Sequence, residues 1–144
     1  MASGYRGDVT VGECWSALSE DPSAVLVDVR TAAEWTYVGI PDLSRLRQNP
    51  LLIEWQSFPS MEVDPDFAAR VVVAVKERGG DQTTPIYFLC RSGVRSIASA
   101  KAATSAGFEN CFNVIDGFEG PPDEDGHRGR KAGWKAEDLP WLQR

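Results

Sequence analysis

The chain has 144 residues, of which 42% are hydrophobic, and this is enough for one globular domain with its own core. The formal net charge of −6 argues against non-specific binding to nucleic acids or to a membrane surface, so any anion site must be locally basic. The sequence has no run of about 18 apolar residues, which would predict a membrane span. It also has no N-terminal segment that is first basic and then apolar, the pattern of a secretion signal. We therefore expect a cytoplasmic protein.

The cysteines and the histidine limit the chemistry that the chain can perform. Cys14, Cys90 and Cys111 are widely spaced, no CxxC pair occurs, and His127 is the only histidine. A zinc site is therefore not expected. Free thiols rather than a disulfide are expected in a reducing compartment, and no metal or organic cofactor is implied.

The first part of the chain predicts two helices and a buried strand. Thr10–Glu13 and Thr31–Glu34 both match the capping box S/T-x-x-E, which marks the start of a helix, and the second helix should run to about Tyr37. Between them, Val25–Val29 is a nearly continuous apolar run, which is typical of a strand covered on both faces in a parallel sheet. Residues 43–63 look like an extended connection.

The middle of the chain predicts one further helix. Within the extended connection, Leu51–Trp55 is a possible strand. Asp64 and Pro65 have the residue types of an N-cap and a first helical position, so we expect a helix to begin there and to end at Gly79–Gly80. Propensity alone would make Val71–Val73 a strand, but the cap and the length of the pattern favour a helix.

A strand, a short loop and a helix follow. Ile86–Leu89 is an apolar run that ends at Cys90, and an Ala-rich helix is expected from Ile97 to Ala106. Phe112–Ile115 predicts a last short strand. Because strands alternate with helices along the chain, we expect an α/β domain with a mostly parallel sheet.

Polar side chains follow the carboxyl ends of the predicted strands. Sites in parallel sheets lie beyond these ends. We therefore expect Asp28, Arg30, Cys90 and the loop after Ile115 to share one edge of the sheet.

The tail of the chain has a different composition, although residues 1–144 are interpreted as a single domain. We interpret a loop rich in Gly, Pro and charge at about 120–132 as an insertion. Its Asp123–Lys131 stretch is either a solvated loop or a lid over the active edge. Gly133-Trp134 and Leu139–Trp141 should pack back onto the domain.

The loop that begins at Cys90 combines a candidate nucleophile with a candidate anion site. In a strand–loop–helix of this kind, successive backbone N–H groups point into the hollow of the loop, next to the positive end of the helix dipole. The same amides would hold an exposed Cys90 as a thiolate, and two arginines add positive charge. The candidate anion-binding residues are Arg91, Ser92, Gly93, Val94, Arg95 and Ser96.

Five short motifs occur in a characteristic order. They are Asp28-Val29-Arg30 with Glu34-Trp35, Gly39-Ile40-Pro41, Cys90 to Ser96, Asp116-Gly117-Phe118 and Gly133-Trp134. With them the chain resembles a single-domain rhodanese-like sulfurtransferase. The resemblance implies a three-layer domain, with a central five-stranded parallel sheet flanked by helices. It also implies thiosulfate sulfurtransferase activity. Cys90 would take the outer sulfur of thiosulfate or a related small anionic donor as a persulfide and release sulfite. It would then pass the sulfur to a thiol, a sulfur-accepting protein or cyanide.

The charged residues near the Cys90 loop also have expected roles. Asp28 and Arg30 are expected to be structural rather than substrate ligands. Arg95 lies at a helix start, where a cation is unfavourable, so Glu34 or Asp28 is expected to pair with it and make the loop rigid. Arg91 is either a recruiter of the anionic donor or a solvated arginine.

Two other functions remain as alternatives. A sulfur-carrier or protein-binding module with the same fold would turn over slowly or not at all. A phosphatase or arsenate reductase is disfavoured, because Arg91–Val94 are the only residues between Cys90 and Arg95. Tyrosine phosphatases have one more residue in this loop.

Overall fold

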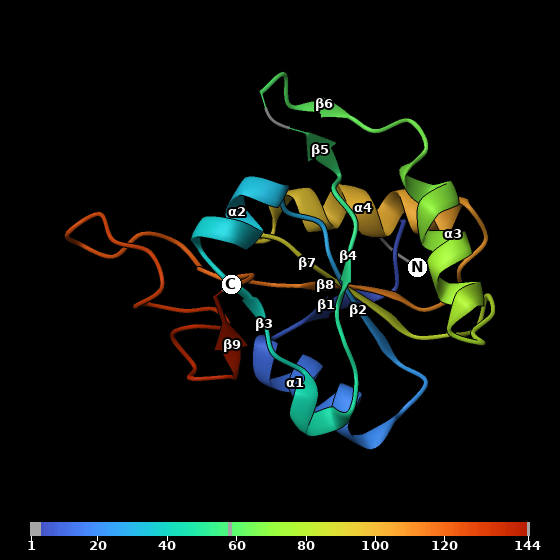
Figure 1. The fold of residues 1–144 in the computed structure, drawn as a ribbon, viewed down its shortest axis with the longest axis horizontal. Coiled ribbons are helices and arrows are strands. Elements are labelled where there is room, and N and C mark those ends of the chain that lie inside the picture. Colours follow the sequence, from blue (N-terminus) through green and yellow to red (C-terminus); the bar gives the residue numbers. More distant parts are fainter. Residues whose placement is uncertain (1–3, 58, 144) are drawn as a thin grey trace.

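A computed structural model describes residues 4–57 and 59–143, and its centre is a five-stranded parallel sheet with the strand order β1-β8-β7-β2-β4 (Figure 1). The strands are β1 (Gly7–Val9), β2 (Val25–Asp28), β4 (Leu51–Leu52), β7 (Ile86–Leu89) and β8 (Cys111–Val114). The predicted α/β class and the predicted parallel five-stranded sheet are therefore confirmed.

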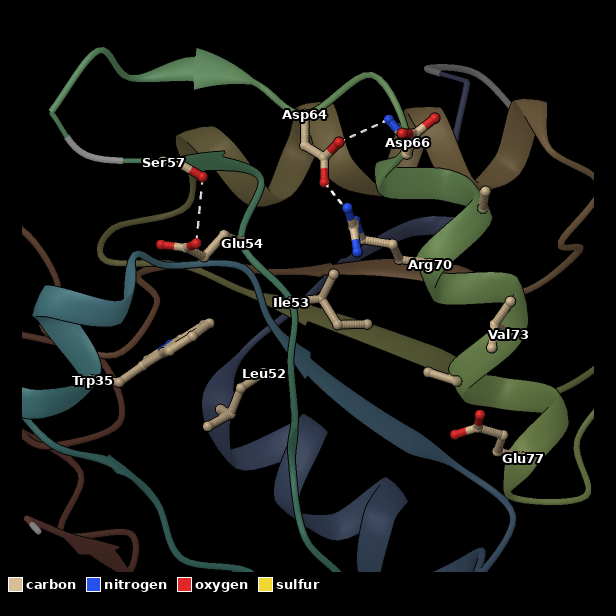
Figure 2. A pocket seen from close by; sticks show the side chains of 12 residues that line it. Trp35, Leu52, Ile53, Glu54, Ser57, Asp64, Asp66, Arg70, Val73 and Glu77 are labelled. Atoms are coloured by element: carbon tan, nitrogen blue, oxygen red, sulfur yellow. Dashed lines mark hydrogen bonds and ion pairs between the residues drawn. The ribbon is translucent and has the colours of Figure 1, made fainter.

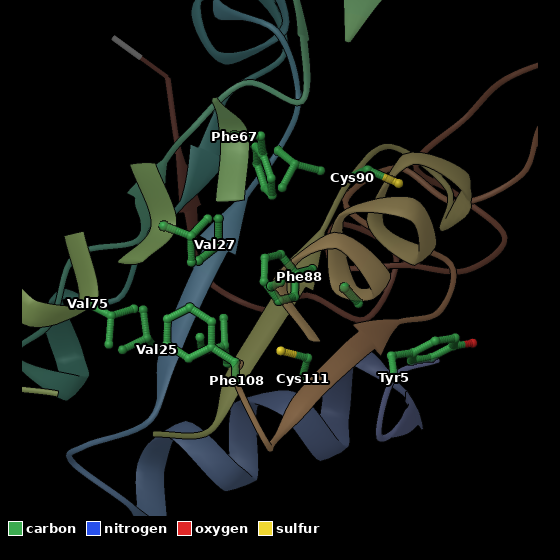
Figure 3. Close-up of a cluster of buried hydrophobic side chains, with 14 residues drawn as sticks. Tyr5, Val25, Val27, Phe67, Val75, Phe88, Cys90, Phe108 and Cys111 are labelled. Carbon is green, nitrogen blue, oxygen red and sulfur yellow. The ribbon is translucent and has the colours of Figure 1, made fainter. Parts of the chain in front are cut away.

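Helices cover both faces of the sheet and make three layers. The helices are α1 (Val11–Glu20), α2 (Ala32–Tyr37), α3 (Phe67–Glu77) and α4 (Val94–Ser105), with a short 3-10 helix at Ser44–Leu46. α3 and α4 pack on one face, where Val27, Phe67 and Phe88 belong to one buried cluster (Figure 3). α1 packs on the other face with Trp134 from the tail. No helix within the described residues is long and apolar enough to cross a membrane.

Two capping boxes begin the first two helices, as the sequence predicts. The Thr10 Oγ1 accepts a hydrogen bond from the Glu13 N–H at 3.1 Å, and the Glu13 carboxylate accepts one from the Thr10 N–H at 2.9 Å. Thr31 and Glu34 make the same reciprocal pair at the start of α2. These bonds satisfy amides that a helix terminus leaves without partners. The second box also fixes Glu34 beside the candidate site.

α3 begins later than predicted, and the assignment of Asp64 and Pro65 to its cap is wrong. The N-cap is Asp66. The Asp64 carboxylate instead accepts a hydrogen bond from the Asp66 N–H at 2.8 Å, and the Asp64 carbonyl accepts one from the Phe67 N–H at 3.1 Å. Aspartate favours both turns and N-caps by bonding to nearby amides, so residue type alone does not distinguish them.

The helix after Cys90 begins at Val94 rather than at Ile97. Gly93 is its N-cap and has a φ of 106°, a left-handed conformation that glycine adopts without steric cost. This turn points the Gly93 N–H back toward the end of β7. At the other end of the helix, Gly107 has a φ of 112° and follows the last helical turn.

Several short strands have no predicted counterpart. Within the 43–63 connection, β5 (Gln56–Ser57) and β6 (Glu62–Val63) form a hairpin. β3 (Ile40–Pro41) pairs with β9 (Trp141–Leu142), and this pair attaches the tail to the domain. The edge strand β1 is also absent from the prediction. Strands of two or three residues are too short to show an alternating pattern of polar and apolar side chains.

Candidate active site at Cys90

Cys90 lies at the carboxyl end of the central strand β7, at the start of the loop that leads into α4. Its Sγ accepts a hydrogen bond from the Gly93 N–H at 3.1 Å and lies 3.2 Å from the Ser96 Oγ. Figure 3 shows the sulfur beside the α4 ribbon, away from Phe88 and the centre of the core. The loop therefore curls around the sulfur.

The prediction of an exposed thiol is wrong for this structure. Cys90 is only 1% exposed, and it borders the buried cluster between the sheet and α4. The sulfur is covered because Gly93 and Ser96 lie directly against it. By contrast, two other side chains of the loop, those of Arg91 and Val94, are exposed. A reactant therefore has to approach from the outer side of the loop.

Backbone amides of the loop provide the candidate anion site. Gly93 donates to the sulfur, whereas five neighbouring amides have no hydrogen-bond partner within residues 4–57 and 59–143. These amides belong to Arg91, Ser92, Val94, Arg95 and Ser96. Unpaired amides at the N-terminus of a helix, next to the positive end of its dipole, stabilise an anion. Unpaired amides are what the predicted cradle requires, and anion binding by this loop stays a prediction.

Arg95 is held by Glu34, one of its two predicted partners. Its Nη1 and Nη2 donate to the Glu34 Oε1 and Oε2 at 2.6 Å and 3.0 Å. Burial acts to raise the pKa of Glu34, but the hydrogen bonds and charge of Arg95 outweigh it, so that pKa lies below its ordinary value. The two-point contact between α2 and α4 fixes the start of α4, and with it the Cys90 loop.

Glu34→Gln should lower the free energy of unfolding more at neutral pH than in acid. Because folding lowers the pKa of Glu34, its carboxylate adds stability above the ordinary pKa of about 4.3, and this stability is lost as the pH falls through the folded-state pKa. We expect the variant to lose about 1 kcal/mol of unfolding free energy at neutral pH. Urea unfolding at several pH values measures this. A deficit that persists unchanged in acid would contradict the role of the charge.

Asp28, the other predicted partner of Arg95, pairs with Arg30 instead. Both side chains are completely buried. The Arg30 Nη2 donates to the Asp28 Oδ2 at 2.8 Å and to the Gly39 carbonyl at 2.7 Å, and the guanidinium lies 4.2 Å from the centre of the Phe118 ring. These contacts connect β2 to the turn before β3 and to the segment after β8.

The turn after β8 holds the backbone of Cys90 and Arg91 through hydrogen bonds. The Phe118 N–H donates to the Cys90 carbonyl at 2.8 Å, and the Glu119 and Gly120 N–H groups donate to the Arg91 carbonyl at 3.0 Å each. Gly117 has a φ of 61°, and a Cβ built there would lie 2.6 Å from the Arg91 carbonyl oxygen. Only glycine fits this approach of two backbone segments.

Gly117→Ala should displace the Cys90 loop. The new methyl group would overlap backbone atoms, which have no side-chain freedom to move away, so we expect a loss of about 1–3 kcal/mol of stability. Gly79→Ala is the matched control, because Gly79 also has a positive φ, of 79°, but nothing lies within 4 Å of its Cβ position. It should cost only the backbone strain, about 1–2 kcal/mol. Iodoacetamide labelling of Cys90 separates the two, since only Gly117→Ala should change its rate.

The loop at about 120–132, which the sequence predicts to be an insertion, is bound to the same turn. The Arg128 Nη1 donates to the Gly120 carbonyl at 2.7 Å, and the Gly129 N–H donates to the Glu119 carbonyl at 2.6 Å. Figure 1 shows the segment, drawn in orange, extending away from the sheet. Within the described residues, its first residue, Gly120, donates to the Arg91 carbonyl, but no hydrogen bond joins residues 121–132 to the Cys90–Ser96 loop. This placement favours a solvated loop over a lid.

The other two cysteines lack a comparable environment. Cys14 and Cys111 are buried, and burial raises the pKa of Cys111 to about 11 and that of Cys14 above its usual range. Both thiols are therefore neutral and poorly reactive at physiological pH.

A cavity elsewhere in the domain does not contain Cys90. It has a volume of about 820 Å³ and lies along residues 52–57, between Trp35 on α2 and the side of α3 (Figure 2). Its lining carries the carboxylates of Glu54, Asp64, Asp66 and Glu77 and one cation, that of Arg70. Because these carboxylates repel an anion, we place the candidate chemistry at the Cys90 loop rather than in this cavity.

The sequence did not point to three residues that hydrogen bonds connect to the Cys90 sulfur through Ser96. Asn113 on β8, Asp8 on β1 and Tyr5 continue a hydrogen-bonded chain that begins at Ser96. Asn113 is a polar residue within a strand that is otherwise mostly buried, and that is the one signal that pointed to it.

Comparisons with known proteins show which family the chain resembles. A family model for the STR4 middle domain matches residues 6–144. An uncharacterized protein from Rickettsia rickettsii is 36% identical over 129 residues, which cover 90% of this chain and 91% of that protein. The chloroplastic rhodanese-like domain-containing protein 4 of Arabidopsis thaliana is 25% identical over 129 residues, which cover 90% of this chain and 24% of that larger protein.

Solved structures show the same fold. The crystal structure of Rv0390 from M. tuberculosis has 46% sequence identity and a TM-score of 0.85, and the match covers 97% of this chain and 99% of that one. A polysulfide-sulfur transferase homodimer from Wolinella succinogenes matches with 21% identity and a TM-score of 0.61, over 98% of this chain and 80% of that one. The chain therefore belongs to the family of the STR4 middle domain and is a rhodanese-like protein.

Proposed function

We propose that this chain is a sulfurtransferase that carries a sulfane sulfur on Cys90. The observation that supports this most directly is the position of the sulfur: its Sγ lies within a loop of backbone amides, one of which already donates to it. A nucleophilic thiolate and an outer persulfide sulfur are both anions, so the same amides stabilise both. Membership of the rhodanese-like family supports a sulfur-related role.

The donor is thiosulfate or a related small anion. The Cys90 sulfur attacks the outer sulfur of thiosulfate and forms a new S–S bond. The S–S bond of thiosulfate breaks, and its electron pair leaves with sulfite. The thiol proton passes to solvent or to sulfite, and the negative charge of the product lies on the outer persulfide sulfur. A thiol, a sulfur-accepting protein or, in an assay, cyanide then removes that sulfur and regenerates Cys90.

Loop size favours sulfur over phosphate as the transferred group. Arg91–Val94 are the only residues between Cys90 and Arg95, and this shorter ring encloses a single sulfur better than a tetrahedral phosphate. Hydrolysis of an aryl phosphate would point to the phosphatase alternative instead.

A slower role as a sulfur carrier or binding module is the second candidate. It is favoured by the burial of Cys90, which is only 1% exposed. In that case the persulfide would form but would transfer rapidly only to a docked protein acceptor. Thiosulfate:cyanide turnover separates the two roles, because the carrier would load sulfur without fast release to cyanide.

The experiment that tests the proposal is intact and peptide mass spectrometry after exposure to thiosulfate. We expect Cys90 to gain one sulfur atom, which cyanide removes. This measurement requires no knowledge of the physiological acceptor. A protein that stays unmodified at Cys90 with thiosulfate, polysulfide and a persulfide donor would not be a sulfurtransferase.

A further inference from the structure

A series of hydrogen-bonded polar groups leads from the buried Cys90 sulfur to Asp8, which is exposed at the edge of the sheet. The Sγ lies 3.2 Å from the Ser96 Oγ, which donates to the Asn113 Oδ1 at 2.5 Å. The Asn113 Nδ2 donates to the Asp8 Oδ1 at 3.0 Å, and the Tyr5 hydroxyl donates to the same carboxylate oxygen at 2.8 Å. Ser96 and Asn113 are 0% and 1% exposed, so water does not replace the bond between them.

The Asp8 carboxylate, at the outer end of this series of hydrogen bonds, determines which group donates in each of them. A carboxylate only accepts, so Asp8 forces Asn113 to present its Nδ2 outward and its Oδ1 inward, toward Ser96. The Oδ1 also only accepts, so it takes the single hydroxyl hydrogen of Ser96. The Ser96 Oγ then turns a lone pair toward the sulfur. Cys90 completes the chain only as an S–H donor.

A thiolate at Cys90 does not fit this arrangement. A negative sulfur would face the lone pair of Ser96 at 3.2 Å. If the hydroxyl turned to donate to the sulfur, the Ser96 Oγ and Asn113 Oδ1 would be left 2.5 Å apart with no hydrogen between them. Either outcome leaves a buried polar group without a partner, which is unfavourable.

We propose that Asp8 and Asn113 are positioning residues that turn the Ser96 hydroxyl away from the sulfur and so hold unloaded Cys90 as a thiol. The proposal rests on the proposed function, since it explains how a reactive cysteine is protected between turnovers. A persulfide needs no such rearrangement. Its Sγ carries neither a hydrogen nor the charge, which lies on the outer sulfur, and Ser96 continues to donate to Asn113.

Other charges around Cys90 act independently of this chain. The Gly93 amide and Arg95 favour a negative sulfur, and Glu34 holds Arg95 in place. The charged groups on the remaining neighbouring elements are Asp28 and Arg30 after β2 and Asp116 after β8. None of them bonds to Ser96 or Asn113, so replacing Asp8 leaves them unchanged.

The test is the pH dependence of Cys90 alkylation by iodoacetamide, followed at this residue by mass spectrometry. In Asp8→Ala the Asn113 amide is free to turn its Nδ2 toward Ser96, whose hydroxyl then donates to the sulfur. We expect alkylation about tenfold faster than in wild type at mildly acidic pH, the effect of one hydrogen bond to an ion, and equal rates at high pH. Asp8 is exposed, so this variant carries little risk for folding.

Two further variants make the result specific. Asn113→Leu removes the acceptor of the Ser96 hydroxyl by another route and should shift the profile in the same direction. Tyr5→Phe removes the other hydrogen bond to Asp8 but keeps the Asn113 amide in place, so its profile should match wild type. Unchanged or slower alkylation at mildly acidic pH in both Asp8→Ala and Asn113→Leu would overturn the proposal.

Sulfur loading by thiosulfate, measured on the same samples, separates this proposal from the proposed function. A shifted alkylation profile without loading in any variant would reject the sulfurtransferase and retain the positioning role. Loading in wild type, with no shift of the alkylation profile in the variants, would retain the sulfurtransferase and reject the positioning role.

Discussion

Cys90→Ser should lose the gain of sulfur from thiosulfate, with thiosulfate:cyanide turnover lower by on the order of 10³-fold or more. A serine hydroxyl is not ionised at neutral pH and is a far weaker nucleophile toward sulfur than a thiolate. The substitution keeps the size of the side chain and places a hydroxyl where the Gly93 N–H still finds an acceptor. The fold should therefore survive, and a thermal melt close to that of wild type would verify it.

Cys111→Ser is the control for this loss. Cys111 is as deeply buried as Cys90, and burial raises the pKa of its thiol to about 11, so it takes no part in the proposed chemistry. The variant should load sulfur at Cys90 as wild type does. Sulfur found on Cys111 or Cys14, or loading that persists in Cys90→Ser, would place the reactive thiol elsewhere and remove the central role of Cys90.

The framework of the fold could be predicted because it depends on interactions between residues that are close together in the sequence. The reciprocal bonds of Thr10 with Glu13 and of Thr31 with Glu34 involve neighbours along the chain, so residue types alone identify them. The continuous apolar run Ile86–Leu89 is equally direct, since a strand buried on both faces needs apolar side chains at every position. These signals place Cys90 at the carboxyl end of a central strand.

The features that the sequence did not predict depend on contacts between distant positions. Asp8 and Asn113 are 105 positions apart, and they meet only because β1 pairs with β8 at the edge of the sheet. β1 itself is three residues long and gives no periodic pattern. The burial of Cys90 likewise depends on how the following turn and Ser96 cover the sulfur, and residue type does not determine that packing.

The Asp28–Arg30 pair illustrates the same limit. The sequence suggested a structural role for both residues and also offered Asp28 as a partner of Arg95. The choice between partners depends on where α2 places Glu34, which is a tertiary property. With Glu34 against Arg95, Asp28 is left to Arg30, and the chain has two separate ion pairs at this edge of the sheet.

Arg30→Met should destabilise the protein by about 3–5 kcal/mol, because it leaves the Asp28 carboxylate buried without its charge partner. Methionine preserves much of the apolar volume beside Phe118, so most of the loss would come from the unpaired charge and from the lost bond to the Gly39 carbonyl. Urea unfolding followed by tryptophan fluorescence measures the effect.

Arg70→Met is the matched control for that loss. Arg70 pairs with Asp64 at 2.7 Å, a distance similar to the 2.8 Å of the buried pair, but its side chain is 61% exposed whereas that of Arg30 is fully buried. An exposed ion pair contributes at most about 1 kcal/mol, since water solvates the partner that remains. The double variant Asp28→Leu with Arg30→Met removes both charges and should recover part of the loss seen in Arg30→Met. If the double variant were less stable than the single one, the cost would come from packing rather than from a stranded charge, and the ion pair would not be what holds this edge of the sheet together.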